Sequence, residues 1–400
     1  MSTKKITKER EKKLKQNIWK FYIYRFFSSM IFVIPIFVLF LQDNGLSMTQ
    51  VMILQAVYTA VIMLAVIPSG IFADYMGRKT ALVINSIFFT LGWTLYALSY
   101  SFFAFLITEI VMAISAALWN SSGTAFFYDT LKELKQESKF KRLYGNTMTI
   151  SHIVWGLSAL IGGYLATYSL RLPYFAVIPP VFLSILVTLS FTETKKYKHG
   201  DKHYITHLKD AAKFSITHPK VKFFIIYAAL FGAVFFNAFM VYQPYLKQIQ
   251  VPLIYFGVIF MFMDFTAAFA SKIAHKVEEF FGEKKILLIM LALAIFAYAG
   301  MSFSILYFGA AFLLITSFVG GLKYPIIMDY INKHVSSHHR ATVMAFSDLS
   351  GSMLCTLSAP FIGWLIDFWG LREAFLFFVV LLVLNLVILL WVFHLNNNRK

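Results

Sequence analysis

The sequence predicts an all-α membrane protein with twelve transmembrane helices in two pseudo-symmetric six-helix bundles. Three observations support this fold class. Of the 400 residues, 59% are hydrophobic and only 14% are charged, whereas a soluble protein of this length needs more charged surface. Apolar runs of about 18 residues or more follow one another along the chain, and each is long enough to cross a bilayer. The two halves of the chain also resemble each other.

The apolar runs are separated by short breaks and one long one. We expect spans at residues 18–41, 49–72, 80–99, 102–128, 144–167, 173–191, 221–245, 252–272, 286–303, 305–330, 342–366 and 372–394. The predicted domains are a basic tail (1–17), a first bundle (18–191), a linker (192–220), a second bundle (221–394) and a second tail (395–400). No small-residue cleavage site follows the basic start, so we expect a retained tail and not a removed signal peptide.

The basic residues indicate how the chain is oriented. The net charge is +17, and the basic residues cluster in alternate loops, as the positive-inside rule requires. This distribution predicts a multi-pass protein of the cell membrane with both termini and the linker in the cytoplasm. It argues against a nucleic-acid partner. The single cysteine, Cys355, excludes an internal disulfide framework.

An internal repeat is visible at an offset of 200 residues. "SALIGGYL" (158–165) aligns with "SAPFIGWL" (358–365), and Asp129 aligns with Asp329. Two homologous halves joined by a linker are the layout in which transport folds build a central site. Chance similarity between apolar helices is the alternative.

A short polar stretch interrupts the apolar sequence between the second and third spans. It reads "GIFADYMGRK" (70–79) and resembles the signature G-x-x-x-D-[RK]-x-G-R-[RK] of the major facilitator superfamily in the corresponding loop. The matching residues are Gly70, Asp74, Gly77, Arg78 and Lys79, and Tyr75 departs from the pattern. A glycine at position 70 lets a neighbouring helix approach closely, and one at position 77 permits a tight turn.

The resemblance implies a conformational latch on the cytoplasmic side. Asp74 would meet the start of the eleventh span, near residues 341–343, where a helix N-terminus stabilises a carboxylate. Arg78 would pair with Asp129 at the end of the fourth span. A merely basic, positive-inside loop is the alternative, but it does not explain Asp74.

Three longer stretches narrow the resemblance. They are "SGTAFFYDTLKEL" (122–134), "YQPYLKQIQVP" (242–252) and "HRATVMAFSDLSGSMLCTLSAPFIGWLID" (339–367), and together they resemble bacterial drug:proton antiporters of the multidrug and tetracycline type. This implies proton-coupled efflux of hydrophobic small molecules by alternating access, by a monomer. Ser158 and Ala159 stand where a glycine and a proline are usual in such antiporters. Uptake of an organic solute and a non-transporting receptor or scaffold therefore remain alternatives.

Ionisable residues inside the spans are costly and need a reason. Candidates for carrying the proton are Glu109, Asp264 and His152; structural pairing or hydrogen bonding is the alternative for each. Candidates for lining the cavity are Arg25, Asn120, Asn237, Gln243 and Lys323. Arg25 is suited to binding an anion or to setting the pKa of a neighbouring acid. The alternative is that its side chain snorkels to the membrane interface. Lys323 either lines the cavity or pairs with Asp329.

The sequence lacks the motifs of several other classes of protein. No G-x-x-x-x-G-K-[ST] loop occurs, so ATP hydrolysis by this chain is unsupported. The histidines of the linker are too scattered for a metal site, and no nucleophile–base constellation indicates an enzyme. We therefore expect no cofactor, no metal and no catalysis, and as partners a small-molecule substrate, protons and the lipid bilayer.

Overall fold

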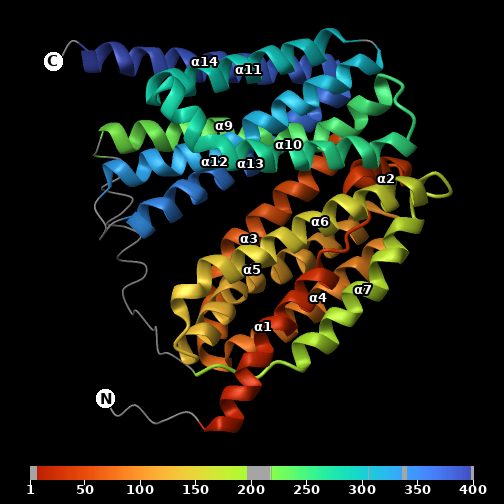
Figure 1. The fold of residues 1–400 in the computed structure, drawn as a ribbon. Helices are drawn as coiled ribbons and strands as arrows, with labels where there is room; N and C mark the ends of the chain where they lie inside the picture. The colour runs from red at the N-terminus through yellow and green to blue at the C-terminus, as the bar shows by residue number, and fades with distance from the viewer. Residues whose placement is uncertain (1–6, 196–216, 218, 305, 336–339, 398–400) are drawn as a thin grey trace. The chain divides into compact units, whose positions relative to one another are not determined.

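The computed structural model describes residues 7–195, 217, 219–304, 306–335 and 340–397. Among these residues every regular element is a helix (Figure 1), which confirms the predicted all-α class. The α-helices are α1 (Lys8–Ser28), α2 (Phe37–Asp43), α3 (Met48–Met76), α4 (Arg78–Leu98), α5 (Phe102–Glu133), α6 (Phe140–Ala166), α7 (Leu172–Leu189), α9 (Pro219–Gln248), α10 (Ile254–Phe281), α11 (Glu283–Phe303), α12 (Ala311–His334), α13 (Arg340–Trp369) and α14 (Leu371–Asn397). Short 3-10 helices lie at Ile34–Ile36, Glu137–Lys139 and Tyr307–Ala310.

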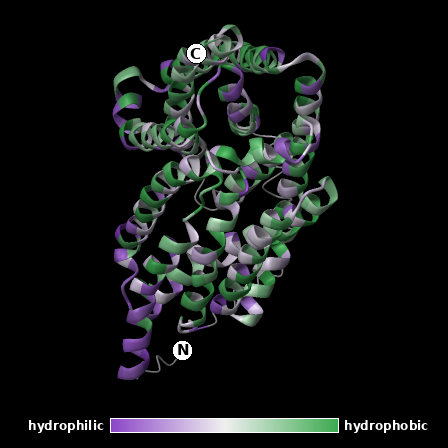
Figure 2. Cartoon of the chain, turned by 90° about the vertical axis from the view of Figure 1, so that its right-hand side faces the viewer, coloured by the Kyte–Doolittle hydropathy of each residue, from purple (hydrophilic) through white to green (hydrophobic). Residues whose placement is uncertain are grey.

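The described helices have the length and composition of membrane spans. Eleven of them are long and apolar enough to cross a bilayer. Figure 2 shows hydrophobic residues along most of the helical ribbons, with hydrophilic residues mainly near helix ends and connections. Large apolar side chains such as Leu64, Phe103 and Phe269 are more than half exposed. Exposed apolar area of this extent is stable in contact with lipid, not water.

The first predicted span is not one helix, so the prediction of a continuous helix over 18–41 is wrong. α1 ends at Ser28, a break follows, and α2 begins only at Phe37. Pro35 lies in the connecting 3-10 turn. Proline lacks the backbone N–H group that helix propagation needs, and it disfavours the helical conformation of the residue before it.

The chain divides into two compact units. Unit 1 contains Met1–Pro35 and Val57–Gly200, and unit 2 contains Ile36–Ala56 and Asp201–Lys400. The division falls inside the predicted linker, most of which (196–216 and 218) lies outside the described residues. The segment 36–56 groups with unit 2 although it belongs to the first half of the sequence.

Specific contacts explain why the segment 36–56 belongs to unit 2. Asp367, near the end of α13, accepts hydrogen bonds from the backbone N of Met48 (2.8 Å) and of Thr49 (2.7 Å), and from Thr49 Oγ1 (2.6 Å). A carboxylate in this position satisfies the free N–H groups at the start of α3. At Gly363 a Cβ would lie only 2.6 Å from Thr49 Cα, so a side chain there would prevent this approach.

Corresponding helices pack in the same way in the two units. In unit 1, α4 packs against α5 and α7; in unit 2, α11 packs against α12 and α14. Gly77 precedes α4 with φ of 110°, and Gly282 precedes α11 with φ of 76°. Both turns need a left-handed backbone, which glycine adopts without strain. The matching pairs support the internal repeat.

Candidate functional site

The signature stretch 70–79 forms the connection between α3 and α4. Arg78 Nη2 lies 2.5 Å from Asp74 Oδ1, and Arg78 Nε lies 3.9 Å from Asp129 Oδ2. Arg78 Nη1 also donates to the carbonyl oxygen of Ser121 at 2.8 Å. The Arg78 guanidinium group thus joins the end of α3 to α5. Its contact with Asp129 is the one that the family resemblance implies. The predicted contact of Asp74 with residues 341–343 would join the two units and stays a prediction.

The two glycines of the signature behave differently. The positive φ of Gly77 agrees with the tight turn expected there. At Gly70 an added Cβ would lie 4.0 Å from Ser121 Cβ, an ordinary van der Waals contact. Within unit 1 a small side chain would therefore fit at Gly70, and the close helix approach expected there stays a prediction.

Glu193 completes this loop and was missed by the sequence reasoning. Its carboxylate accepts hydrogen bonds from the backbone N of Lys79 (3.0 Å) and of Thr80 (3.4 Å). These amides are at the N-terminus of α4, where free N–H groups and the helix dipole favour an anion. The available signal was that Glu193 is the only acidic residue in "TETKKYK" (192–198), a basic stretch directly after the sixth span.

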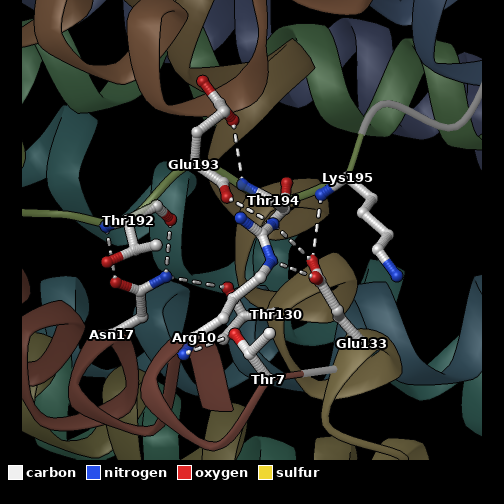
Figure 3. A network of polar contacts seen from close by, with 9 residues as sticks. All are labelled: Thr7, Arg10, Asn17, Thr130, Glu133, Thr192, Glu193, Thr194 and Lys195. Atoms are coloured by element: carbon white, nitrogen blue, oxygen red, sulfur yellow. Dashed lines mark hydrogen bonds and ion pairs between the residues drawn. The ribbon is translucent and has the colours of Figure 1, made fainter. Parts of the chain in front are cut away.

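A network of polar contacts fixes the residues around Glu193 (Figure 3). Arg10 donates from Nε to Glu133 Oε1 (2.7 Å) and from Nη2 to the carbonyl oxygen of Glu193 (3.1 Å). The Glu133 carboxylate raises the pKa of the Arg10 guanidinium, so Arg10 stays charged at physiological pH. Asn17 is fully buried and exchanges two hydrogen bonds with the backbone of Thr192. The start of α1, the end of α5 and the start of the linker are thereby tied together within unit 1.

Glu193→Ala is expected to lower the free energy of unfolding by about 0.5–2 kcal/mol, because the first amides of α4 lose their acceptor. Thermal unfolding of the purified protein in detergent measures this loss. Glu9→Ala is the matched control, since Glu9 is an exposed carboxylate whose ion pair is with Lys13 four residues along α1. Equal melting temperatures for the Glu193 variant and the wild type would contradict the capping role.

Among the proton-carrier candidates, Glu109 is buried inside a span. It lies on α5, is 3% exposed and accepts a hydrogen bond from the hydroxyl of Tyr96 on α4. Tyr96 in turn packs against Tyr174 of α7, with ring centroids 5.7 Å apart. A carboxylate in such a place is enclosed by α4, α5 and α7.

The other two proton-carrier candidates are less enclosed. Asp264 is half-buried on α10. His152 is exposed on α6, and its ring stands edge-on to Trp155 with centroids 5.3 Å apart. The role of His152 as a proton carrier stays a prediction.

Arg25 is the buried cation of unit 1. It is 9% exposed, and its Nε and Nη2 atoms donate to Ser151 Oγ on α6 at 3.0 Å and 2.6 Å. Its guanidinium carbon lies 4.8 Å from the ring centroid of Trp119 on α5. The side chain is therefore held within the helix bundle by α5 and α6 and does not snorkel to the interface.

The remaining cavity candidates fall into two groups. Asn237 and Gln243 of α9 are buried and hold the fold together: Asn237 Nδ2 donates to Ser358 Oγ (3.0 Å), and Gln243 Oε1 accepts from the backbone N of Val38 (2.7 Å). Asn120 of α5 is exposed. Lys323 of α12 lies 5.4 Å from the ring centroid of Phe235. The pairing of Lys323 with Asp329 is not observed, because Asp329 pairs with Lys333 at 2.6 Å.

Comparison with known proteins decides the family. The family model of the Major Facilitator Superfamily matches residues 21–353 and 265–400, which together are most of the chain. The chain belongs to the major facilitator superfamily. The predicted family is thus confirmed, and with it the multi-pass membrane transporter fold.

Individual relatives of this superfamily member are distant. It is 23% identical to the uncharacterized MFS-type transporter YxaM of Bacillus subtilis, over 88% of this chain and 90% of that one. It is 25% identical to the quinolone resistance protein NorA of Staphylococcus aureus, but only over 44% of this chain and 45% of NorA.

Solved structures with this fold are also dissimilar in sequence. The nucleoside transporter NupG matches with a TM-score of 0.77 and 14% identity, over 94% of this chain and 98% of that one. A bacterial homologue of the human lysosomal transporter Spinster, solved in an inward-facing and unoccupied conformation, matches with a TM-score of 0.74 and 16% identity, over 96% and 97%. These likenesses show the fold alone.

The described residues of this superfamily member can be searched for groups with functional chemistry. The part of the chain that the structure describes contains no cluster of three or more metal-ligating side chains. The buried charged side chains of unit 1 among the described residues are Arg25, Glu109, Asp129 and Glu133. Asp129 and Glu133 lie toward the end of α5 and have cationic partners. Glu109 and Arg25 contact different helices, α4 and α6 respectively.

Proposed function

We propose that this protein exports hydrophobic small molecules in exchange for protons, by alternating access. The observation that carries the proposal is the burial of Glu109 within a membrane span, next to the Tyr96 hydroxyl. An intramembrane carboxylate is costly and marks a proton or ion pathway in membrane proteins. The similarity to NorA, whose name states quinolone resistance, supports export as the direction.

The charge distribution supports a setting for the proposed activity. The basic loops favour a position of both termini and the linker in the cytoplasm. The proposal is completed by a monomer in the plasma membrane of a bacterial cell. The latch of Gly70, Asp74, Gly77, Arg78, Lys79 and Asp129 then lies on the cytoplasmic side. An ion pair at a helix end contributes about 0.3–2 kcal/mol, which biases two conformations without locking one.

Transport into everted membrane vesicles tests the direction. Vesicles energised by respiration are offered a panel of hydrophobic fluorescent compounds, and the wild type is compared with vesicles from cells without the protein. An exporter accumulates at least one compound in everted vesicles when a proton gradient is present, and loses this accumulation with an uncoupler. Accumulation only in right-side-out vesicles would establish uptake, and none in either would favour a receptor or scaffold.

Uptake of an organic solute is the second candidate. Two observations favour it: Ser158 and Ala159 replace the glycine and proline usual in antiporters, and the fold is shared with the nucleoside transporter NupG. A non-transporting scaffold is disfavoured, because neither the charged latch nor a buried carboxylate within a span has a use in a static protein.

Asp74→Asn is expected to reduce the tolerance of expressing cells to the exported compound several-fold, with the protein level intact. The substitution keeps the shape of the side chain but removes the charge that lies 2.5 Å from Arg78 Nη2. In the proposed latch this charge also meets the helix N-terminus near residues 341–343, so the conformation closed to the cytoplasm should lose stability. Growth inhibition in a host lacking its own pumps measures the effect. Asp74→Glu retains the charge and serves as the control. Unchanged transport by the asparagine variant would disprove the latch.

A further inference from the structure

Arg25 stands out among the buried groups because all its partners are neutral. Its hydrogen bonds go to one serine hydroxyl, Ser151 Oγ, and its ring contact is with Trp119. Among the described residues no carboxylate lies within ion-pair distance of it. A permanently charged guanidinium in a membrane protein is expensive to bury without a counter-ion, so the structure contains an unmatched positive charge.

The guanidinium also keeps an edge that a ligand can contact. Nη1 makes no hydrogen bond with a described residue, and it is not among the fully buried polar atoms that lack a partner. Nη1 therefore keeps accessible surface. Ser151 binds the opposite side of the group, so the free edge keeps a fixed direction. A planar guanidinium with a free edge matches the geometry of a carboxylate or sulfonate.

The depth of Arg25 agrees with a substrate position. Trp119, which lies under the guanidinium, precedes Asp129 on α5 by ten residues, or about 15 Å along a helix. The hydrocarbon core is about 30 Å thick. With Asp129 of the proposed latch at the cytoplasmic surface, Arg25 is expected close to the bilayer midplane. Substrate sites of carriers built from two repeats occupy this depth.

The surroundings of Arg25 are aromatic on one side and polar on the other. The ring of Trp119 packs on Phe21 and Tyr24, with centroids 6.3 Å and 5.8 Å away. The next residue, Asn120, is exposed. An amide facing lipid at this depth is unfavourable, which supports contact of this part of α5 with water.

We infer that the Arg25–Ser151–Trp119 cluster binds the anionic group of an aromatic organic anion. The guanidinium pairs with the carboxylate or sulfonate, and Trp119 packs against the aromatic body. This inference rests on the proposed transport function and names the substrate class for it. It also assigns roles: Arg25 binds the ligand directly, and Ser151 is a positioning residue that orients the guanidinium.

Equilibrium binding to the full-length protein in lipid nanodiscs tests the charge preference. The probes are naphthoate, the neutral naphthamide and the cationic naphthylmethylammonium, which share one ring system, and empty nanodiscs correct for partition into lipid. The wild type is expected to bind naphthoate at least tenfold more tightly than the other two. Equal affinities for all three probes, or preference for the cation, would overturn the inference without any variant.

Variants then locate the site. Arg25→Gln should lower naphthoate affinity at least tenfold and leave naphthamide affinity within twofold, whereas Arg25→Lys should retain part of the preference. Ser151→Ala should weaken naphthoate binding less than Arg25→Gln, because the charge remains. Lys20→Gln is the matched control: it removes a cation from the same helix, where Lys20 donates to the backbone of Ser190, and should bind naphthoate as the wild type does.

Two outcomes separate this inference from the proposed function. Wild-type naphthoate affinity in a folded Arg25→Gln variant would overturn the anion site, whatever the direction of transport. Selective naphthoate binding without accumulation in everted vesicles would keep the anion site and overturn export, because binding in nanodiscs needs neither a gradient nor a direction.

Discussion

Replacing Glu109 by glutamine is expected to reduce substrate-induced proton release from energised everted vesicles to the level of vesicles that lack the protein. Glutamine keeps a carbonyl oxygen that accepts from the Tyr96 hydroxyl, so the packing of α4 against α5 should survive. It does not titrate, so the exchange of substrate for protons loses its carrier. The recovery of a quenched pH-sensitive dye after substrate addition measures the release.

The control for this variant is a second carboxylate on the same helix. Glu133 is also buried and pairs with Arg10, but it lies at the opposite end of α5. Glu133→Gln should therefore retain substrate-induced proton release per folded molecule, even where it lowers stability. Undiminished release by the Glu109 variant would move the proton-carrying role elsewhere, first to Asp264 of α10, for which Asp264→Asn is the corresponding test.

An anionic substrate would alter the energetics of this exchange. The interior of a respiring bacterium is electrically negative, and moving one charge across the membrane is worth about 2.3 kcal/mol per 100 mV. An anion bound at Arg25 would thus leave the cell downhill with respect to the potential. Export of such a substrate would need less from the inward proton movement through Glu109 than export of a neutral or cationic one.

Much of the fold could be predicted from the sequence, because each membrane span is determined by one continuous segment of the chain. A run of apolar residues must be a helix in lipid, since every backbone group needs a partner within the segment. The apolar runs accordingly identified the long helices from α3 onward. The break in the first span was not predicted. Its residues are consecutively apolar, so hydrophobicity alone does not show the break at Pro35 or the contact with helix α6.

The site was readable only where a short motif carried it. Arg78 and Asp129 were paired by the family pattern, and they are neighbours in the structure. Glu193 was missed because its partners, the first amides of α4, lie more than 110 positions away in the sequence. The capping of α3 by Asp367 spans more than 300 positions. Composition and periodicity indicate which residues are neighbours along one helix. They do not indicate contacts between residues far apart in the sequence.

Gly162→Ala is expected to be the most destabilising of the small substitutions considered for this protein. A Cβ at Gly162 of α6 would lie 1.7 Å from the carbonyl oxygen of Phe32 and 2.7 Å from its carbonyl carbon. Both atoms are backbone of the break after α1, so no side-chain rotation relieves the clash. Overpacking of this kind costs about 1–3 kcal/mol, measured as a lower melting temperature in detergent.

Gly145→Ala is the matched control, because it lies on the same helix and an added Cβ meets nothing within 4 Å. It should raise stability by as much as about 1 kcal/mol, since alanine is the better helix former. The contrast isolates the contact with Phe32 from helix propensity. A melting temperature for Gly162→Ala at or above that of Gly145→Ala would show that α6 does not need this close approach.

The Gly162→Ala substitution also tests whether the packing of α6 affects ligand binding. The contacts of α6 with the α1 region include Gly162 at the break and Ser151 at Arg25, which are eleven residues or about 16 Å apart along the helix. Displacing α6 at Gly162 should therefore misplace Ser151 and weaken naphthoate binding in the molecules that remain folded. Full naphthoate affinity in folded Gly162→Ala protein would mean that Arg25 keeps its orientation without the α1–α6 contact, and that Ser151 does not position it.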